Sequence, residues 1–161
     1  MTKKQQPNQV FKPDIYVGID PGVNTGVAVW HTKEQFLETA KTFNIVEAMH
    51  WISLQYASGI FHGPPPDNIQ KSVHIVIEDA RKRKGDAGLT DEKKQGAGSV
   101  KRDSKIWQEF CEYYGIPYTL KAPNVKLNAI AKNREVWERQ TGYTKQTSEH
   151  ARCAAMLVWK L

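Results

Sequence analysis

Two acidic residues of this chain each follow a short apolar run, at a point where a carboxylate can take part in chemistry. Asp20 ends the run Ile15 to Ile19, and Glu78 ends the run Val73 to Ile77. Acids at the ends of buried strands are costly to desolvate, and two such charges held together favour a neutralising cation. Carboxylate oxygens suit Mg²⁺ or Mn²⁺, which can activate water against a phosphodiester. If the two strands are neighbours, the sequence predicts a divalent-metal site with hydrolytic chemistry.

Each acid also has an ordinary structural interpretation. Asp20 precedes Pro21 and Gly22, a combination that is typical of turns. Asp79 lies beside Glu78, and adjacent strand residues point to opposite faces of a sheet, so only one of them can face Asp20. Of this pair, we select Glu78.

Basic residues follow Glu78 directly and would place positive charge beside the two acids. They begin as an unbroken run and continue toward the following helix and strand. Such cations attract the phosphates of nucleic acid, although a solvated charged loop is the alternative. The predicted phosphate-binding residues are Arg81, Lys82, Arg83, Lys84, Lys101, Lys121 and Lys126.

Apolar periodicity predicts the elements that position these residues. Period-two and β-branched runs predict strands, and apolar residues at helical spacing predict helices. The expected strands are 15–19, 27–30, 36–43, 73–77 and 116–120, and the expected helices are 45–57, 100–114, 124–130 and beyond, and 147–159. Such an order favours an α/β fold, a mixed five-stranded sheet flanked by helices.

Three segments lack a regular period. Residues 1–13 are polar and contain two prolines, so we expect a flexible tail before a single domain of residues 14–161. The Gly- and Pro-rich stretch 63–67 is expected to be a connection. The stretch 80–100, rich in Lys, Arg and Gly, is expected to be a mobile basic loop.

Composition narrows the class of protein. The chain has 161 residues and a formal net charge of +6, which favours a polyanionic partner. Its two cysteines, Cys111 and Cys153, are too few for a disulfide framework, so a reducing compartment is expected. No apolar run is long enough to span a membrane or form a signal peptide, which predicts a cytoplasmic protein without a membrane partner.

Four motifs in order resemble the RuvC-type Holliday-junction resolvases. GIDPGVNTGVAVW, residues 18–30, is similar to the opening motif of that family, and VIEDA, residues 76–80, is similar to the second. The stretch 96–122, together with Lys126, resembles the segment that follows. SEHARCAAMLVW, residues 148–159, resembles the closing helix. The resemblance spans nearly the whole chain, from about residue 15 to residue 159.

This resemblance implies an RNase H-like fold, a homodimer, and metal-dependent cleavage of DNA at four-way junctions, as in recombination and repair. It implies that Asp20 and Glu78 are catalytic carboxylates that bind Mg²⁺, with Mn²⁺ able to substitute. His150 matches the first polar position of the closing helix, where the family has an acid or His. It would bind metal or position the attacking water. The implied setting is a bacterial cell or a phage-infected host.

The closing helix departs from the family pattern at Cys153, where an Asp is expected. A thiolate is a soft ligand and a poor one for Mg²⁺, so the metal site and the cleavage are both put in doubt. Either the residue is a deliberate substitution, or the family tolerates Cys here, or Glu149 supplies the missing oxygen. Glu149 lies four residues before Cys153 and therefore on the same helical face.

Two other functions fit the same residues. The chain could be a binding module that recognises branched DNA without cutting it, because Cys153 disables its metal site. It could also be an RNase H-like nuclease for a flap or an RNA hybrid, since fold does not fix substrate.

Overall fold

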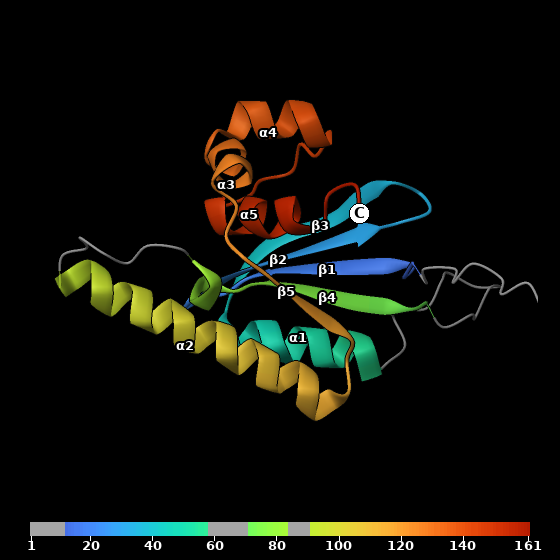
Figure 1. Cartoon of the computed structure of the whole chain (residues 1–161). Coiled ribbons are helices and arrows are strands. Elements are labelled where there is room, and N and C mark those ends of the chain that lie inside the picture. Colours follow the sequence, from blue (N-terminus) through green and yellow to red (C-terminus); the bar gives the residue numbers. More distant parts are fainter. Residues whose placement is uncertain (1–11, 58–70, 84–90) are drawn as a thin grey trace, which may run out of the picture.

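The computed structural model describes residues 12–57, 71–83 and 91–161. They form a five-stranded mixed sheet with helices on both faces (Figure 1). The strands are β1 (Ile15–Asp20), β2 (Asn24–His31), β3 (Phe36–Asn44), β4 (Val73–Glu78) and β5 (Tyr118–Lys121), in the order β3-β2-β1-β4-β5. The first three are antiparallel neighbours, and β4 and β5 run parallel to β1. The expected mixed five-stranded sheet is confirmed.

The helices form two layers, one on each face of the sheet (Figure 1). The first layer holds α1 (Ile45–Ala57) and α2 (Asp91–Tyr114). The second holds α3 (Val125–Lys132), α4 (Arg134–Thr141) and α5 (Glu149–Val158), and a short 3₁₀ turn, Ala80–Lys82, follows β4. Within the described residues, no helix is both long and apolar enough to cross a membrane.

Strand alternation divides the core between the two faces. Val17 and Ile19 of β1 face α1 and α2 and pack in one buried cluster with Ile52 and Trp107. Trp30 of β2 belongs to the other cluster, with the buried side of α5 and the helices next to it. Because Asp20 follows Ile19 by one position, it faces α5, and so does Glu78 after Ile77.

The structure corrects the prediction of a mobile basic loop over residues 80–100. The 3₁₀ turn and then α2 occupy much of this stretch, so Lys101 lies within a helix of 24 residues. The misreading arose because residues 91–100 show no apolar period in the sequence. Their Lys, Glu, Gln and Ala residues have high helix propensity, and helix propagates readily from the packed second half.

Smaller differences concern the ends of elements. The strand predicted at 116–120 begins at Tyr118, and β2 begins three residues earlier than predicted, at Asn24. The helix expected to continue beyond Ile130 stops at Lys132, and Asn133 caps the next helix by accepting from the backbone N–H of Val136. The predicted connection at 63–67, nearly all of the predicted tail, and Lys84 lie outside the described residues.

Candidate active site

The two acids predicted from the strand ends lie on neighbouring strands. β1 and β4 are parallel partners, so Asp20 and Glu78 emerge together at the carboxyl edge of the sheet, both on the face that α5 covers. Glu78 is only 8% exposed. Burial raises the pKa of Glu78, and the nearby charge of Asp20 raises it further. The structure therefore holds two negative charges close together in a partly desolvated place.

His150 joins this pair from the first turn of α5. Ser148 caps that helix by accepting a hydrogen bond from the backbone N–H of Ala151, and this cap fixes the start of the turn that contains His150. The His150 Nδ1 atom lies 3.0 Å from the Asp20 Oδ2 atom. This hydrogen bond raises the pKa of His150, while partial burial opposes the shift. The imidazole is half exposed, so it is open to solvent or a ligand.

Cys153 lies one helical turn after His150 and is 9% exposed. Burial raises the pKa of its thiol to about 12, and the charges of Asp20, Glu78 and Glu149 add to the shift. The thiol therefore carries its proton at neutral pH. Cys153 lies near the two acids, at the position where the sequence predicted a metal ligand. Its thiol is neutral there and lacks the negative charge that an Asp would carry.

Glu149 is exposed at the start of α5. Its charge contributes to the raised pKa values of both His150 and Cys153, so it lies at the same end of the helix. The sequence prediction named it as a substitute oxygen ligand. Among the described residues, no group of three or more His, Cys, Asp or Glu side chains is arranged to hold a metal ion.

Two glycines explain how α5 reaches the acids. A Cβ atom added at Gly18 of β1 would collide with the carbonyl oxygen of Ala154, and one added at Gly26 of β2 would collide with that of His150. Gly26 is also the register partner of Asp20. The absence of side chains at these positions lets the backbone of α5 lie directly on the sheet, with His150 over Asp20.

Sequence reasoning missed two residues that support Glu78 from the helices. The Asn128 side chain of α3 donates to the Glu78 Oε2 atom at 3.5 Å and lowers the pKa of Glu78. The Ser104 hydroxyl of α2 donates to the Glu78 backbone oxygen at 3.2 Å. Neither residue had a spacing that linked it to Glu78, because both contacts depend on how helices dock on the sheet.

Asp79 and Arg81 form a separate pair. Asp79 accepts from the Arg81 Nε atom at 2.7 Å, and Arg81 also donates to the Gln108 side chain. Asp79 caps the 3₁₀ turn as well. Its carboxylate is therefore occupied away from Asp20, which agrees with the choice of Glu78 over Asp79.

The remaining basic residues have varied surroundings. The Lys82 ammonium donates to the backbone oxygen of Leu120, and the Lys121 ammonium donates to that of Leu157. Arg83 is exposed, and its charge lowers the pKa of Glu78, so it lies near the acids. Lys126 is exposed in the first turn of α3. Two of these basic residues can therefore be placed relative to Glu78. The charge of Arg83 acts on Glu78, and Lys121 is the residue paired with Glu78 between β4 and β5.

The strand order and the helices on both faces define an RNase H-like fold. The solved structure of T. thermophilus RuvC in complex with a Holliday junction substrate has this fold and matches with a TM-score of 0.53, covering 91% of each chain at 13% sequence identity. The resemblance stated from the motifs is thus confirmed at the level of fold. No protein-family model matches the chain, and no curated protein matches it in sequence.

Proposed function

We propose that this chain is a divalent-metal-dependent endonuclease that cuts branched DNA, with the four-way junction as its substrate. The observation that carries the proposal is the meeting of Asp20 and Glu78 beneath His150 at one edge of the sheet. The solved structure of similar fold was bound to a Holliday junction, which makes that substrate the first to test.

The donor set fits a hard divalent cation. Mg²⁺ is commonly held by one or two carboxylates, with water and substrate phosphate oxygens as its other ligands, so two acids are enough protein ligands. The raised pKa of Glu78 agrees with this fit, because a cation between the two carboxylates would offset both the burial of Glu78 and the repulsion by Asp20 that raise it. When bound, such an ion would supply Lewis-acid stabilisation of the phosphodiester and a more acidic water.

The chain's own residues have separate parts in this proposal. Asp20 and Glu78 would hold the ion as its two protein ligands. His150 holds Asp20 in one orientation through the 3.0 Å hydrogen bond, and because its side chain is half exposed, the ring could take or give a proton. Arg83 and Lys126 would meet phosphates of the scissile strand and its neighbour.

We also propose that the active form is a homodimer. Two sites related by a two-fold axis match two symmetric strands of a junction. The second half of α2 offers exposed aromatic surface for such a contact: Tyr113 is 83% exposed and Tyr114 is 47% exposed. Trp107 of the same helix is fully buried and belongs to the core.

The substitution Asp20→Asn tests the assignment of the acids. Removing the charge should abolish cleavage, with a loss larger than the roughly 10- to 100-fold typical of residues outside the ligand set. Junction binding should persist, because phosphate contacts do not depend on Asp20. Cleavage of a labelled synthetic junction with Mg²⁺, and its binding without Mg²⁺, are the measurements.

Asp14→Asn is the matched control for this experiment. Asp14 lies at the opposite end of the first strand and accepts hydrogen bonds from Ser72. The same chemical change there should leave cleavage within about twofold of the parent, since no metal ligand is lost. If the Asp20 variant cut as fast as the parent, the proposed site would be wrong.

The neutral Cys153 thiol favours a second candidate, a module that binds branched DNA without cutting it. A protonated thiol adds no charge to balance a metal, so the site has one anionic ligand fewer than the family pattern. Under our proposal the parent cuts, and Cys153→Asp cuts faster by about tenfold, because one more hard ligand tightens metal binding.

Cys153→Ser is the control for that comparison, because it keeps a small neutral side chain. Cleavage by the Asp variant alone would mean that the parent is a disabled nuclease. If neither the parent nor the Asp variant cut the junction while both bound it, the binding module would be the better description.

A further inference from the structure

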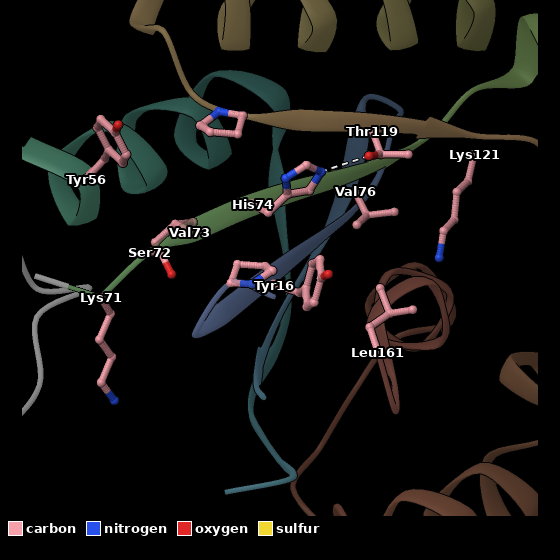
Figure 2. A pocket seen from close by; sticks show the side chains of 12 residues that line it. Tyr16, Tyr56, Lys71, Ser72, Val73, His74, Val76, Thr119, Lys121 and Leu161 are labelled. Atoms are coloured by element: carbon pink, nitrogen blue, oxygen red, sulfur yellow. Dashed lines mark hydrogen bonds between the residues drawn. The ribbon is translucent and has the colours of Figure 1, made fainter. Parts of the chain in front are cut away.

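A cavity of about 620 Å³ is lined by residues that do not include the two acids. It opens over β1, β4 and β5, on the sheet face where α5 packs against β1 and β2 (Figure 2). At one end of the cavity lie Lys71 and Ser72, just before the start of β4. At the other end lies Lys121, the last residue of β5. Nothing in the proposed cleavage chemistry uses this cavity.

The charged side chains that line the cavity are positive. Lys71 and Lys121 contribute ammonium groups, and none of the twelve lining residues is acidic. Burial lowers the pKa of Lys121, whose ammonium has a backbone oxygen as its hydrogen-bond acceptor. An anion in the cavity would therefore be a better partner for this buried cation than the carbonyl group.

Two acids outside the cavity do not neutralise it. Asp14 accepts from Ser72 and lies 3.1 Å from the Lys33 ammonium. Glu38, whose pKa is lowered chiefly by the His31 hydrogen bond and to a smaller extent by Lys71, lies 2.6 Å from the His31 ring. Both carboxylates therefore already have partners of their own, and neither is paired with Lys121.

Flat rings line the middle of the cavity. Tyr16 of β1 and His74 of β4 meet edge to face with their centroids 5.7 Å apart, and both are partly exposed. The His74 ring is held by a 2.8 Å hydrogen bond with the Thr119 hydroxyl, shown as a dashed line in Figure 2. Rings that are fixed in place offer stacking surface for a base at little cost in side-chain entropy.

We infer that the cavity binds an unpaired stretch of DNA strand, with bases against Tyr16 and His74 and phosphates at Lys71 and Lys121. This inference rests on the proposed function, since it takes the strand to be part of the substrate. Lys121 is the register partner of Glu78, so a strand laid along β4 and β5 passes from the acids into the cavity. Six residues of β4 span roughly 20 Å, enough for several nucleotides.

The test is the binding of a fluorescent oligothymidylate of about eight nucleotides, measured by anisotropy in EDTA so that no cleavage is needed. His74→Ala should weaken binding roughly tenfold through the loss of one stacked base. Lys71→Gln should weaken binding and make the salt dependence shallower by about one phosphate contact. Lys41→Gln, an equally neutralising change on the far edge strand β3, should do neither.

A second measurement uses the parent chain itself, so that it does not depend on the folding of a variant. An oligonucleotide carrying 5-bromodeoxyuridine should cross-link on irradiation, and mass spectrometry should find the adduct on Tyr16 or His74. Adducts found only elsewhere, or equal binding by parent, His74→Ala and Lys71→Gln, would overturn the inference. Equally tight binding of polyglutamate in competition would show an unspecific anion site instead.

The two proposals fail in different ways. If the parent cuts junctions but its cavity variants bind oligothymidylate as the parent does, the cleavage assignment stands and the cavity inference falls. If the parent binds oligothymidylate through Lys71 and His74 but cuts no junction, the cavity is supported and the nuclease assignment falls.

Discussion

At the scale of single residues, the site depends on how four side chains share charge. Asp20 and Glu78 bring two carboxylates together, and the Nδ1 atom of His150 forms a hydrogen bond with Asp20. Cys153 adds no charge because burial keeps its proton on. Without a cation, the imidazolium of His150 is therefore the group that compensates Asp20, which makes their contact dependent on pH.

His150 should stabilise the metal-free protein in acid more than in base. Its folded-state pKa is raised above the ordinary value of 6.5, so the folded state binds the proton more tightly than the unfolded chain. The stabilisation is fully present below about pH 6.5 and is lost as the pH rises through the higher folded-state value. Urea unfolding in EDTA should show the advantage of the parent over His150→Gln shrinking along that range.

A mutant cycle isolates this contact from the nearby titration of Glu78. The same His150→Gln change made in an Asp20→Asn background should show a much weaker dependence on pH, because the partner charge is gone. An equal pH dependence in both backgrounds would mean that Asp20 is not what raises the pKa of His150.

At the scale of elements, the position of α5 decides whether the acids and the imidazole meet at all. The helix lies on Gly18 and Gly26 without intervening side chains. The hydroxyl group of Ser148, the residue that caps it, is hydrogen-bonded to the hydroxyl group of Thr42 in β3. The glycines set the height of the helix above the sheet, and the cap sets where its first turn begins. Both constraints act at the end that carries His150.

Gly26→Ala should displace the start of α5 and weaken the site together with the fold. The added methyl group would collide with the carbonyl oxygen of His150, which is backbone and has little room to move. Overpacking of this kind costs about 1–3 kcal/mol. The expected results are a lower urea midpoint and a loss of junction cleavage, with His150 resonances shifted in NMR spectra.

The same change at Gly98, Gly98→Ala, should have the opposite effect on stability. Gly98 lies within α2, and a Cβ atom there would meet open space. Alanine should therefore stabilise the protein by about 0.5–1 kcal/mol and leave cleavage unchanged. If both glycine variants behaved alike, close packing of α5 would not explain Gly26.

The same elements explain what could and could not be predicted from the sequence. Apolar runs end at Asp20 and Glu78, so the strand ends and their acids were accessible to reasoning from local pattern. The first turns of α2 were missed because they have propensity without an apolar period, and the break at Asn133 was missed because a cap is a single residue. Asn128 and Ser104 were missed because tertiary docking, not spacing, brings them to Glu78.

At the scale of the whole molecule, the two faces of the sheet have different surroundings. The helices α5 and α2 lie on opposite faces of the sheet (Figure 1). The face of α5 carries the acids and the cavity, and α2 ends in two exposed tyrosines. The rings of Tyr113 and Tyr114 meet edge to face with their centroids 5.0 Å apart, and the ring centroid of Tyr114 lies 4.9 Å from that of Phe110. An aromatic surface of this kind is typical of the centre of a protein interface. DNA on one face and a partner on the other would not compete for space.

Tyr113→Asp should therefore convert a dimer into a monomer. A charge placed at the centre of an apolar contact must be desolvated without a partner, which costs several kcal/mol at an interface. Sedimentation velocity should show the parent as a dimer and the variant as a monomer. Val125→Asp is the matched control, since Val125 is also 83% exposed but begins α3, in the helix layer on the other face of the sheet.

The same variant links assembly to the outcome of cleavage. A dimer can cut two strands of a cruciform plasmid in one encounter and linearise it, whereas a monomer cuts one strand and leaves a nicked circle. Tyr113→Asp should thus shift the products from linear to nicked plasmid while each single cut still requires Asp20. A parent that sediments as a monomer, or a variant that stays dimeric, would contradict the role given to α2, and linear product from a monomer would contradict the link between symmetry and paired cuts.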